Sequence, residues 1–83
     1  MISAEQSRAA RGLLNWSQSE LAARSNLGES TIRNFEAGRR VPAINNLAAI
    51  RRAFEAAGVV TIGDDESSPS GGAGVRLASR ASQ

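Results

Sequence analysis

Four residue types are missing from this 83-residue chain: cysteine, histidine, lysine and tyrosine. Without cysteine and histidine, the chain has no disulfides, none of the common zinc sites, and no thiol or imidazole catalytic group. Without lysine, it has neither the phosphate-binding lysine of a P-loop nor a lysine that forms a Schiff base. Asp64, Asp65 and Glu66 lack the spacing and the closing glutamate of a calcium-binding loop. We therefore expect no enzyme activity, no metal and no cofactor.

Long apolar segments and aromatic residues are also scarce. No apolar run approaches the length needed to cross a bilayer, and the first residues lack the basic-then-apolar order of a signal peptide. With two Phe and one Trp, a core must be built largely from Leu, Ile, Val and Ala, which suits closely packed helices. A chain of this length corresponds to one small domain, and we expect it in the cytoplasm.

Every positively charged side chain is arginine, and the charge is unevenly distributed. Residues 1–58 carry eight Arg and five acidic residues, a net charge of +3, whereas residues 59–83 carry two Arg and three acidic residues, a net charge of −1. Arginine suits contacts with phosphate and guanine because its planar guanidinium donates two parallel hydrogen bonds. A codon bias toward high GC content would also enrich arginine and alanine, and the composition does not decide between these two explanations.

The stretch Ser17–Gly38 contains the signals of two short helices and of the break between them. Ser17 is placed as an N-cap, and Glu20, three residues later, completes a capping box. Trp16 and Leu21 have the spacing of a hydrophobic staple. The first helix then carries a narrow face of apolar and small residues, namely Leu21, Ala22 and Ser25.

The first of these helices should stop at Asn26, because asparagine tolerates the left-handed conformation found at helix C-termini. Gly28 then lets the chain turn into the second helix. In that helix Ile32 and Phe35 point inward, and Gly38 caps the C-terminus. Two short helices joined in this way fit a helix-turn-helix unit. The residues left on the outer side of the second helix are Glu29, Ser30, Arg33 and Asn34.

Two longer helices are predicted on either side of this unit. Ser3 and Gln6 form the capping box of a helix that runs to about Leu14, with Arg8 facing solvent. The inward residues of this helix should include Ala10, Leu13 and Leu14.

The other flanking helix follows a basic loop. Pro42 ends this loop, and the helix begins near Ala43–Asn45 and runs to about Ala57, where Gly58 stops it. Arg51 and Glu55 have the spacing of an ion pair on one helix face. The apolar stripe is Ile44, Leu47, Ala48, Ile50, Ala53 and Phe54.

The C-terminal segment is predicted to form a β-hairpin. Val59–Ile62 is a β-branched run, 63–74 is acidic and rich in Ser, Pro and Gly, and Val75–Leu77 is a second apolar run. An isolated two-stranded hairpin is only marginally stable in water. It therefore pairs with a second copy, packs on the helices, or stays disordered, and the sequence leaves these three alternatives open. Residues 78–83 are expected to be a frayed tail.

The central stretch contains the residue pattern of a known family. The residues concerned are Gln18, Leu21, Ala22, Asn26, Leu27, Ile32, Phe35, Glu36 and Gly38. This pattern resembles that of the phage-repressor and Cro type of helix-turn-helix proteins, also called the xenobiotic-response-element family, from about Ile2 to about Gly58. The resemblance implies a mainly α fold, with a four-helix, lambda-repressor-like helix-turn-helix domain over residues 1–58. A small β-hairpin would follow at 59–78 and a flexible tail at 79–83.

The resemblance also implies a DNA-binding surface. The second helix of such a unit enters the major groove, where its N-terminal residues meet the edges of the bases. Arg33 has the donors to bind guanine, Asn34 can bind adenine, and Glu29 can accept from the amino group of cytosine. Together with Ser30, these residues would read bases. Phosphate contacts are implied for Ser17, Gln18, Thr31, Arg39 and Arg40.

Each of these residues also has a purely structural interpretation. An acid such as Glu29 is favoured at a helix N-terminus by the helix dipole, and it repels phosphate. The other predicted base-reading residues are also ordinary surface residues of a helix, and Gln18 is an ordinary first-turn residue. Thr31 could pack within the domain, and the two loop arginines could simply be solvated.

Two further features are implied by the resemblance. In such proteins an arginine of the first helix pairs with the glutamate that ends the recognition helix, and those positions fall here on Arg11 and Glu36, so we expect a partly buried ion pair. A single module of this size makes a limited interface with DNA, so we also expect a homodimer on an inverted repeat. The candidate dimerisation residues are Val60, Ile62, Val75 and Leu77.

The favoured function is a sequence-specific DNA-binding transcriptional regulator, most often a repressor. The homodimer would insert the helix from about Glu29 to Ala37 into the major groove of double-stranded operator DNA, and it would act at the nucleoid in a bacterial cytoplasm. The alternative is a protein-binding module on the same fold, such as an antitoxin or antiactivator, that sequesters a partner protein and binds DNA weakly or not at all. Val59–Leu77 could be its partner-binding extension.

Overall fold

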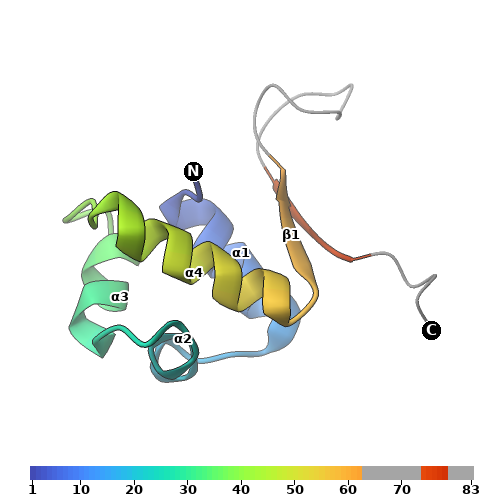
Figure 1. The fold of residues 1–83 in the computed structure, drawn as a ribbon, viewed down its shortest axis with the longest axis horizontal. Coiled ribbons are helices and arrows are strands. Elements are labelled where there is room, and N and C mark those ends of the chain that lie inside the picture. Colours follow the sequence, from blue (N-terminus) through green and yellow to red (C-terminus); the bar gives the residue numbers. More distant parts are fainter. Residues whose placement is uncertain (63–73, 79–83) are drawn as a thin grey trace.

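Four α-helices and a two-stranded antiparallel sheet make up the part of the chain that the computed structural model describes, residues 1–62 and 74–78 (Figure 1). This confirms the predicted mainly helical architecture with a C-terminal hairpin. The predicted acidic loop and the tail after Ala78 lie outside the described residues. The elements are α1 (Ala4–Leu14), α2 (Gln18–Ser25), α3 (Glu29–Glu36), α4 (Ile44–Ala56), β1 (Val59–Ile62) and β2 (Gly74–Leu77).

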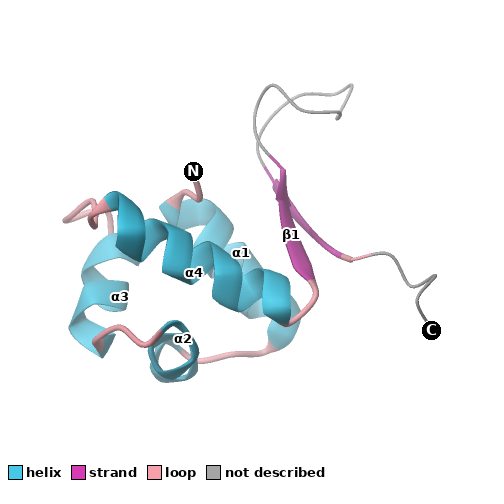
Figure 2. Ribbon diagram, viewed as in Figure 1, coloured by secondary structure: helices cyan, strands magenta, loops and turns pink. Residues whose placement is uncertain are grey.

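The helices enclose one core, and the hairpin lies against one side of it. α2 packs against α3 and α4, α1 packs against α3, and the strands lie against α1 and α4. Figure 2 shows α3 and the hairpin at opposite ends of the longest axis of the domain. The buried apolar residues are Ile2, Ala10, Leu21, Ala22, Ile32, Phe35, Leu47, Ile50, Ala53, Phe54 and Val59.

The helix ends follow the local signals in the sequence. Ser3 and Gln6 form the complete capping box at the start of α1. Asn15 and Asn26, which end α1 and α2, both adopt the left-handed conformation, with φ of 57° and 60°. After Asn26 the Leu27 N–H donates to the carbonyl of Ala22 at 3.0 Å, which is the wrapping bond of a Schellman motif. These short-range bonds fix where α1 and α2 end.

Two details of the helix-turn-helix unit differ from the sequence predictions. Ser17 caps α2 by accepting from the Glu20 N–H, but the Glu20 carboxylate accepts from Arg24 at 2.7 Å, so only half of the predicted capping box forms. Gly28 is the N-cap of α3 with a φ of −72°, a value that any residue adopts. The turn into α3 therefore does not depend on the conformational freedom of glycine.

Two aliphatic residues that were expected in the core lie at the surface. Leu13 is 46% exposed and Ile44 is 65% exposed. In α1, Ala10 is buried as predicted, and the other buried positions are Gln6 and Ser7, whose polar partners come from the hairpin and from α3. Ile44 is the first residue of α4 and lies at the edge of the core.

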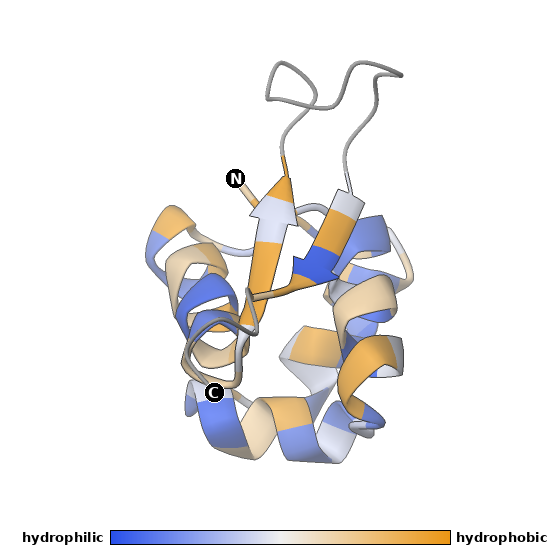
Figure 3. Cartoon of the chain, turned by 90° about the vertical axis from the view of Figure 1, so that its right-hand side faces the viewer, coloured by the Kyte–Doolittle hydropathy of each residue, from blue (hydrophilic) through white to orange (hydrophobic). Residues whose placement is uncertain are grey.

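The hairpin is joined to the helices by both packing and hydrogen bonds. Val59 is fully buried, and Val75 packs against the core. Figure 3 views the domain from the hairpin side, with apolar positions along both strands. The side-chain amide of Gln6 donates to the carbonyls of Ile62 and Gly74, at 2.9 and 3.0 Å, and so bridges the two strands from α1. Three alternatives were left open for the C-terminal segment. In the structure, its two strands pack on the helices of the same chain.

Candidate nucleic-acid interface

The outer side of α3 is open to solvent and carries the residues that were predicted to read bases. Ile32 and Phe35 are buried and hold the inner side of the helix against the core, which leaves the opposite side free. Glu29, Ser30 and Arg33 are exposed. Gly38 follows the helix with a φ of +77°, and the next N–H, of Arg39, donates to the carbonyl of Asn34 at 2.9 Å. α3 is thus a short rod with a defined end and one accessible side.

The predicted base-reading residues form two columns on this side. Glu29 and Arg33 are four residues apart and form an ion pair of 3.5 Å between Oε2 and Nη2, with both side chains about half exposed. Ser30 and Asn34, with the same spacing, line a polar surface groove instead. One column is therefore charged and internally paired, and the other is neutral and can both donate and accept hydrogen bonds.

The groove beside α3 lies between this helix and the start of α4. It has a volume of about 390 Å³ and is open on one side. Thr31 lines it, so this residue is placed both to pack and to meet a ligand. Of the two loop arginines, Arg40 reaches the groove. The lining residues are Ser30, Thr31, Asn34, Arg40, Val41, Pro42, Ala43 and Asn46.

Arg39 and Arg40 are exposed in the loop after α3, and neither has an acidic partner among residues 1–62 and 74–78. They differ in this from four arginines of the helices, each of which pairs with a glutamate; these are Arg11, Arg24, Arg33 and Arg51. The loop therefore presents positive charge that is not compensated locally. It lies next to the open side of α3.

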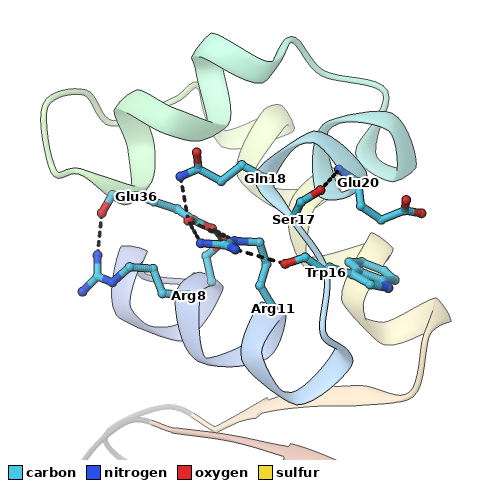
Figure 4. Close-up of polar contacts among 8 residues, drawn as sticks. Arg8, Arg11, Trp16, Ser17, Gln18, Glu20 and Glu36 are labelled. Atoms are coloured by element: carbon cyan, nitrogen blue, oxygen red, sulfur yellow. Dashed lines mark hydrogen bonds and ion pairs between the residues drawn. The ribbon is translucent and has the colours of Figure 1, made fainter.

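Behind the exposed side, a polar network fixes α3 to α1 and α2 (Figure 4). The Glu36 carboxylate is 1% exposed and accepts two hydrogen bonds from the Arg11 Nε and one from its Nη2, at 2.7 to 3.1 Å. Ser7 donates to the same carboxylate, and the Gln18 amide donates to it at 3.2 Å. The predicted pair of Arg11 and Glu36 is thus present, but it is the centre of a larger network.

Arg8 extends this network to the end of α3. Its side chain is exposed as expected, yet its guanidinium donates to the backbone carbonyl of Glu36, in the last turn of the helix. A cation at a helix C-terminus also interacts favourably with the helix dipole. Sequence reasoning missed both Arg8 and Ser7 as partners of Glu36. Their spacing, three and four residues before Arg11 on the same helix, was the available signal.

The network also determines the charge of Glu36. Burial of the carboxylate raises its pKa, but the hydrogen bonds from Arg11, Ser7 and Gln18 outweigh burial and hold the pKa below its usual value. The same pairing raises the pKa of Arg11. Both groups are therefore charged near neutral pH, and the pair is an internal structural contact rather than part of the exposed surface.

The residues predicted to contact phosphate at the start of α2 are already engaged within the domain. Ser17 accepts from the Glu20 N–H, and the Gln18 amide nitrogen donates to Glu36. A phosphate oxygen accepts hydrogen bonds, and the only donor of the Gln18 side chain is its amide nitrogen. A phosphate contact would therefore use the same nitrogen that already donates to Glu36. A hydrogen bond from Gln18 to DNA would therefore be coupled directly to the end of α3.

The four predicted dimerisation residues do not lie on one face of the hairpin. In the antiparallel register Val59 faces Leu77 and Val60 faces Arg76, and successive residues of a strand point to opposite sides. Val75 and Leu77 are therefore on the side of the buried Val59, whereas Val60 and Ile62 are on the other side. The sequence does not reveal the register of the strands, so it could not show that these four residues are divided between two faces.

The described residues contain no group of three or more acidic side chains placed to hold a metal ion. Within the same ranges, none of the helices combines the length and hydrophobicity that crossing a membrane would require. A model of a helix-turn-helix family, of the Cro/C1 type, matches residues 8–56, which include α2, α3 and all of the Glu36 network except Ser7. The comparison with curated proteins gave no match.

Proposed function

The chain belongs to the Cro/C1-type helix-turn-helix family, whose members bind DNA, regulate transcription and are not enzymes, and on this basis we propose that it is a sequence-specific repressor. In this proposal a homodimer inserts α3 into the major groove of an inverted-repeat operator, at the nucleoid of a bacterial cell. The observation that carries the proposal is the open outer side of α3, which lies at the end of the domain opposite the hairpin (Figure 1). Among residues 1–62 and 74–78, no segment has to move before this side can meet a duplex.

The division of the outer side suggests how the duplex is contacted. Glu29, Ser30, Arg33 and Asn34 would face base edges, with guanine for Arg33 and adenine for Asn34. The groove beside α3 would receive one strand of the sugar-phosphate backbone, because Arg40 and the hydroxyl of Thr31 both line it. Arg39, Ser17 and Gln18 would add phosphate contacts around it.

The homodimer is proposed to form through the outer face of the hairpin, where Val60 and Ile62 lie. Because α3 and the hairpin are at opposite ends of the domain, such a dimer separates the two α3 helices widely. We therefore expect half-sites one helical turn apart, roughly 34–36 Å, or a multiple of that spacing. A binding selection from a randomised duplex library would give the half-site sequence and this spacing together.

Replacing Arg33 with alanine is expected to weaken operator binding by about 1–3 kcal/mol and to relax the preference at one guanine. The fold should not change, because the Arg33 side chain is about half exposed and packs against nothing in the core. The measurements are affinity for the selected operator and thermal unfolding of both proteins. A variant that binds like the wild type would contradict the assignment of this face. A wild-type chain that selects no DNA sequence would favour the protein-binding alternative.

Replacing Arg39 or Arg40 with alanine should weaken binding to all duplexes to a similar extent. Each phosphate contact releases counterions, so each loss should reduce the slope of log K against log salt by about 1 for each protomer. Arg52, an exposed arginine in the middle of α4, provides the matched control and should leave the slope unchanged when replaced. An unchanged slope after the loop substitutions would mean that the loop is simply solvated.

A further inference from the structure

The ion pair on the outer side of α3 concerns a residue that sequence reasoning left ambiguous. Glu29 repels phosphate, yet it stands on the side of the helix that is proposed to face DNA. Its carboxylate lies 3.5 Å from the Nη2 of Arg33, one turn further along. The nearest positive charges of the loop, Arg39 and Arg40, have no such acidic partner among the described residues. The arginine that is proposed to read a base is therefore paired with an acid, whereas the two loop arginines are not.

We propose that Glu29 is a positioning residue that directs Arg33 toward a guanine edge and away from phosphate. The inference rests on the proposed function, since it assigns a role within the same surface. Glu29 lies on the side of α3 that is proposed to face the bases, but it acts through Arg33 and makes no base contact of its own. In this role Glu29 improves the discrimination between DNA sequences. At the same time, its negative charge lowers the affinity for DNA of any sequence.

Two physical effects support this role. An arginine side chain has many rotamers, and a carboxylate on the same helix face restricts them, so less entropy is lost when the guanidinium binds guanine. At 3.5 Å the contact with Glu29 is an ion pair rather than a hydrogen bond, so the N–H donors of the guanidinium remain available for the two acceptors of guanine. The negative charge of Glu29 also cancels much of the attraction between Arg33 and phosphate, which is the part of binding that is independent of sequence.

Ion pairs of this spacing are common on helices, so the position of the pair is what matters. The pair of Arg51 and Glu55 on α4 has almost the same geometry, with 3.6 Å between Nε and Oε2 and both side chains about half exposed. It lies outside the outer side of α3 and outside the adjacent groove. Glu55→Gln is therefore a matched control for Glu29→Gln, since each removes one charge from an exposed pair and keeps the size of the side chain.

The experiment compares the wild type, Glu29→Gln, Glu55→Gln and Arg33→Ala. For each protein, affinity is measured for the selected operator, for a random duplex, and for operators changed at the guanine whose preference Arg33→Ala relaxes. Glu29→Gln should bind the random duplex more tightly and lose about tenfold in the ratio of operator to random affinity. Its salt slope should rise by about 1 for each protomer, because Arg33 becomes free to contact phosphate. Glu55→Gln should leave the ratio and the slope unchanged.

Two results would overturn the inference. In the first, Glu29→Gln raises affinity for all duplexes equally, with the ratio unchanged, as expected of an acid that only repels phosphate. In the second, Glu29→Gln alters the preference at a cytosine and not at the guanine assigned to Arg33, as expected of a direct base contact. Failure of the proposed function looks different, because then Arg33→Ala also binds like the wild type. Thermal unfolding of each variant confirms that the fold is retained.

Discussion

Replacing Arg11 with alanine is expected to lower the free energy of unfolding by about 3–5 kcal/mol, because it leaves the buried Glu36 carboxylate without its cation. Ser7 and Gln18 would still donate to this carboxylate, but neither carries a charge. The change is measured by urea unfolding near neutral pH. Since Glu36 ends α3, we also expect the variant to lose DNA affinity in proportion to the fraction of molecules that are unfolded.

The matched control is Arg51→Ala, which removes an arginine from an exposed ion pair with Glu55 and should cost less than about 1 kcal/mol. A second control replaces both Arg11 and Glu36 with apolar residues of similar size. The double variant should be more stable than Arg11→Ala, because no buried charge is then left unpaired. If Arg11→Ala cost no more than Arg51→Ala, the pair would have no special structural role.

The same network predicts how stability depends on pH. The pKa of Glu36 is held below its ordinary value near 4.5, so the ionised carboxylate stabilises the folded state above that pH. This stability is lost as the pH falls from about 4.5 through the lowered folded-state pKa. The difference in stability between the wild type and the Glu36→Gln variant should therefore shrink over this acidic range. A difference that stays constant with pH would show that the charge of Glu36 is not responsible.

Ending the chain at Gly58 is expected to destabilise the helical domain by about 3–5 kcal/mol. The truncation removes Val59, whose complete burial contributes about 1.5–3 kcal/mol. It also removes the two hydrogen bonds that the Gln6 amide donates to the strands, each with a net contribution of about 0.5–1.5 kcal/mol. The measurement is thermal unfolding of the truncated and full-length chains. A truncated chain as stable as the full one would show that the hairpin is only an appendage.

Because truncation changes stability, it does not by itself test dimerisation, and two adjacent substitutions separate the two roles. Val59→Thr places a hydroxyl in the core and should destabilise the domain, with little effect on the mass of the native protein. Val60→Asp alters the outer face of the hairpin and should lower the native mass if this face forms the dimer, with a smaller effect on stability. If Val60→Asp stays dimeric, the outer face of the hairpin is not the dimer interface.

Helix ends and the helix-turn-helix unit were predictable because the interactions that form them span three to five residues. The capping box of Ser3 and Gln6, the left-handed Asn26 and the cap at Gly38 all satisfy backbone groups within one turn. The inward positions of Ile32 and Phe35 followed from their spacing on one helix. The prediction failed where a side chain had two possible partners. The Glu20 carboxylate accepts from Arg24, one turn along the helix, and does not complete the capping box.

Contacts between elements were not predictable in the same way. Gln6 was assigned to a cap, and the fold adds two bonds from its amide to strands 56 and 68 residues away. Arg8 was predicted to face solvent, and Ser7 had no assigned role. Both contact Glu36, and these contacts exist only because α3 lies beside α1 in the fold. Leu13 fitted the apolar pattern of its helix but lies where no other described element covers it.

The sequence by itself determined that this chain is mainly helical and contains a helix-turn-helix unit, because helix periodicity, caps and family pattern are properties of consecutive residues. Only the tertiary structure decided which charges remain available on the surface. Arg11 pairs with the buried Glu36, and Arg33 pairs with Glu29 at the surface. Arg39 and Arg40 lie in a loop and have no acidic partner among the described residues. The physical reason is that burial and pairing of a charge depend on distances through space, which the order of residues along the chain does not specify.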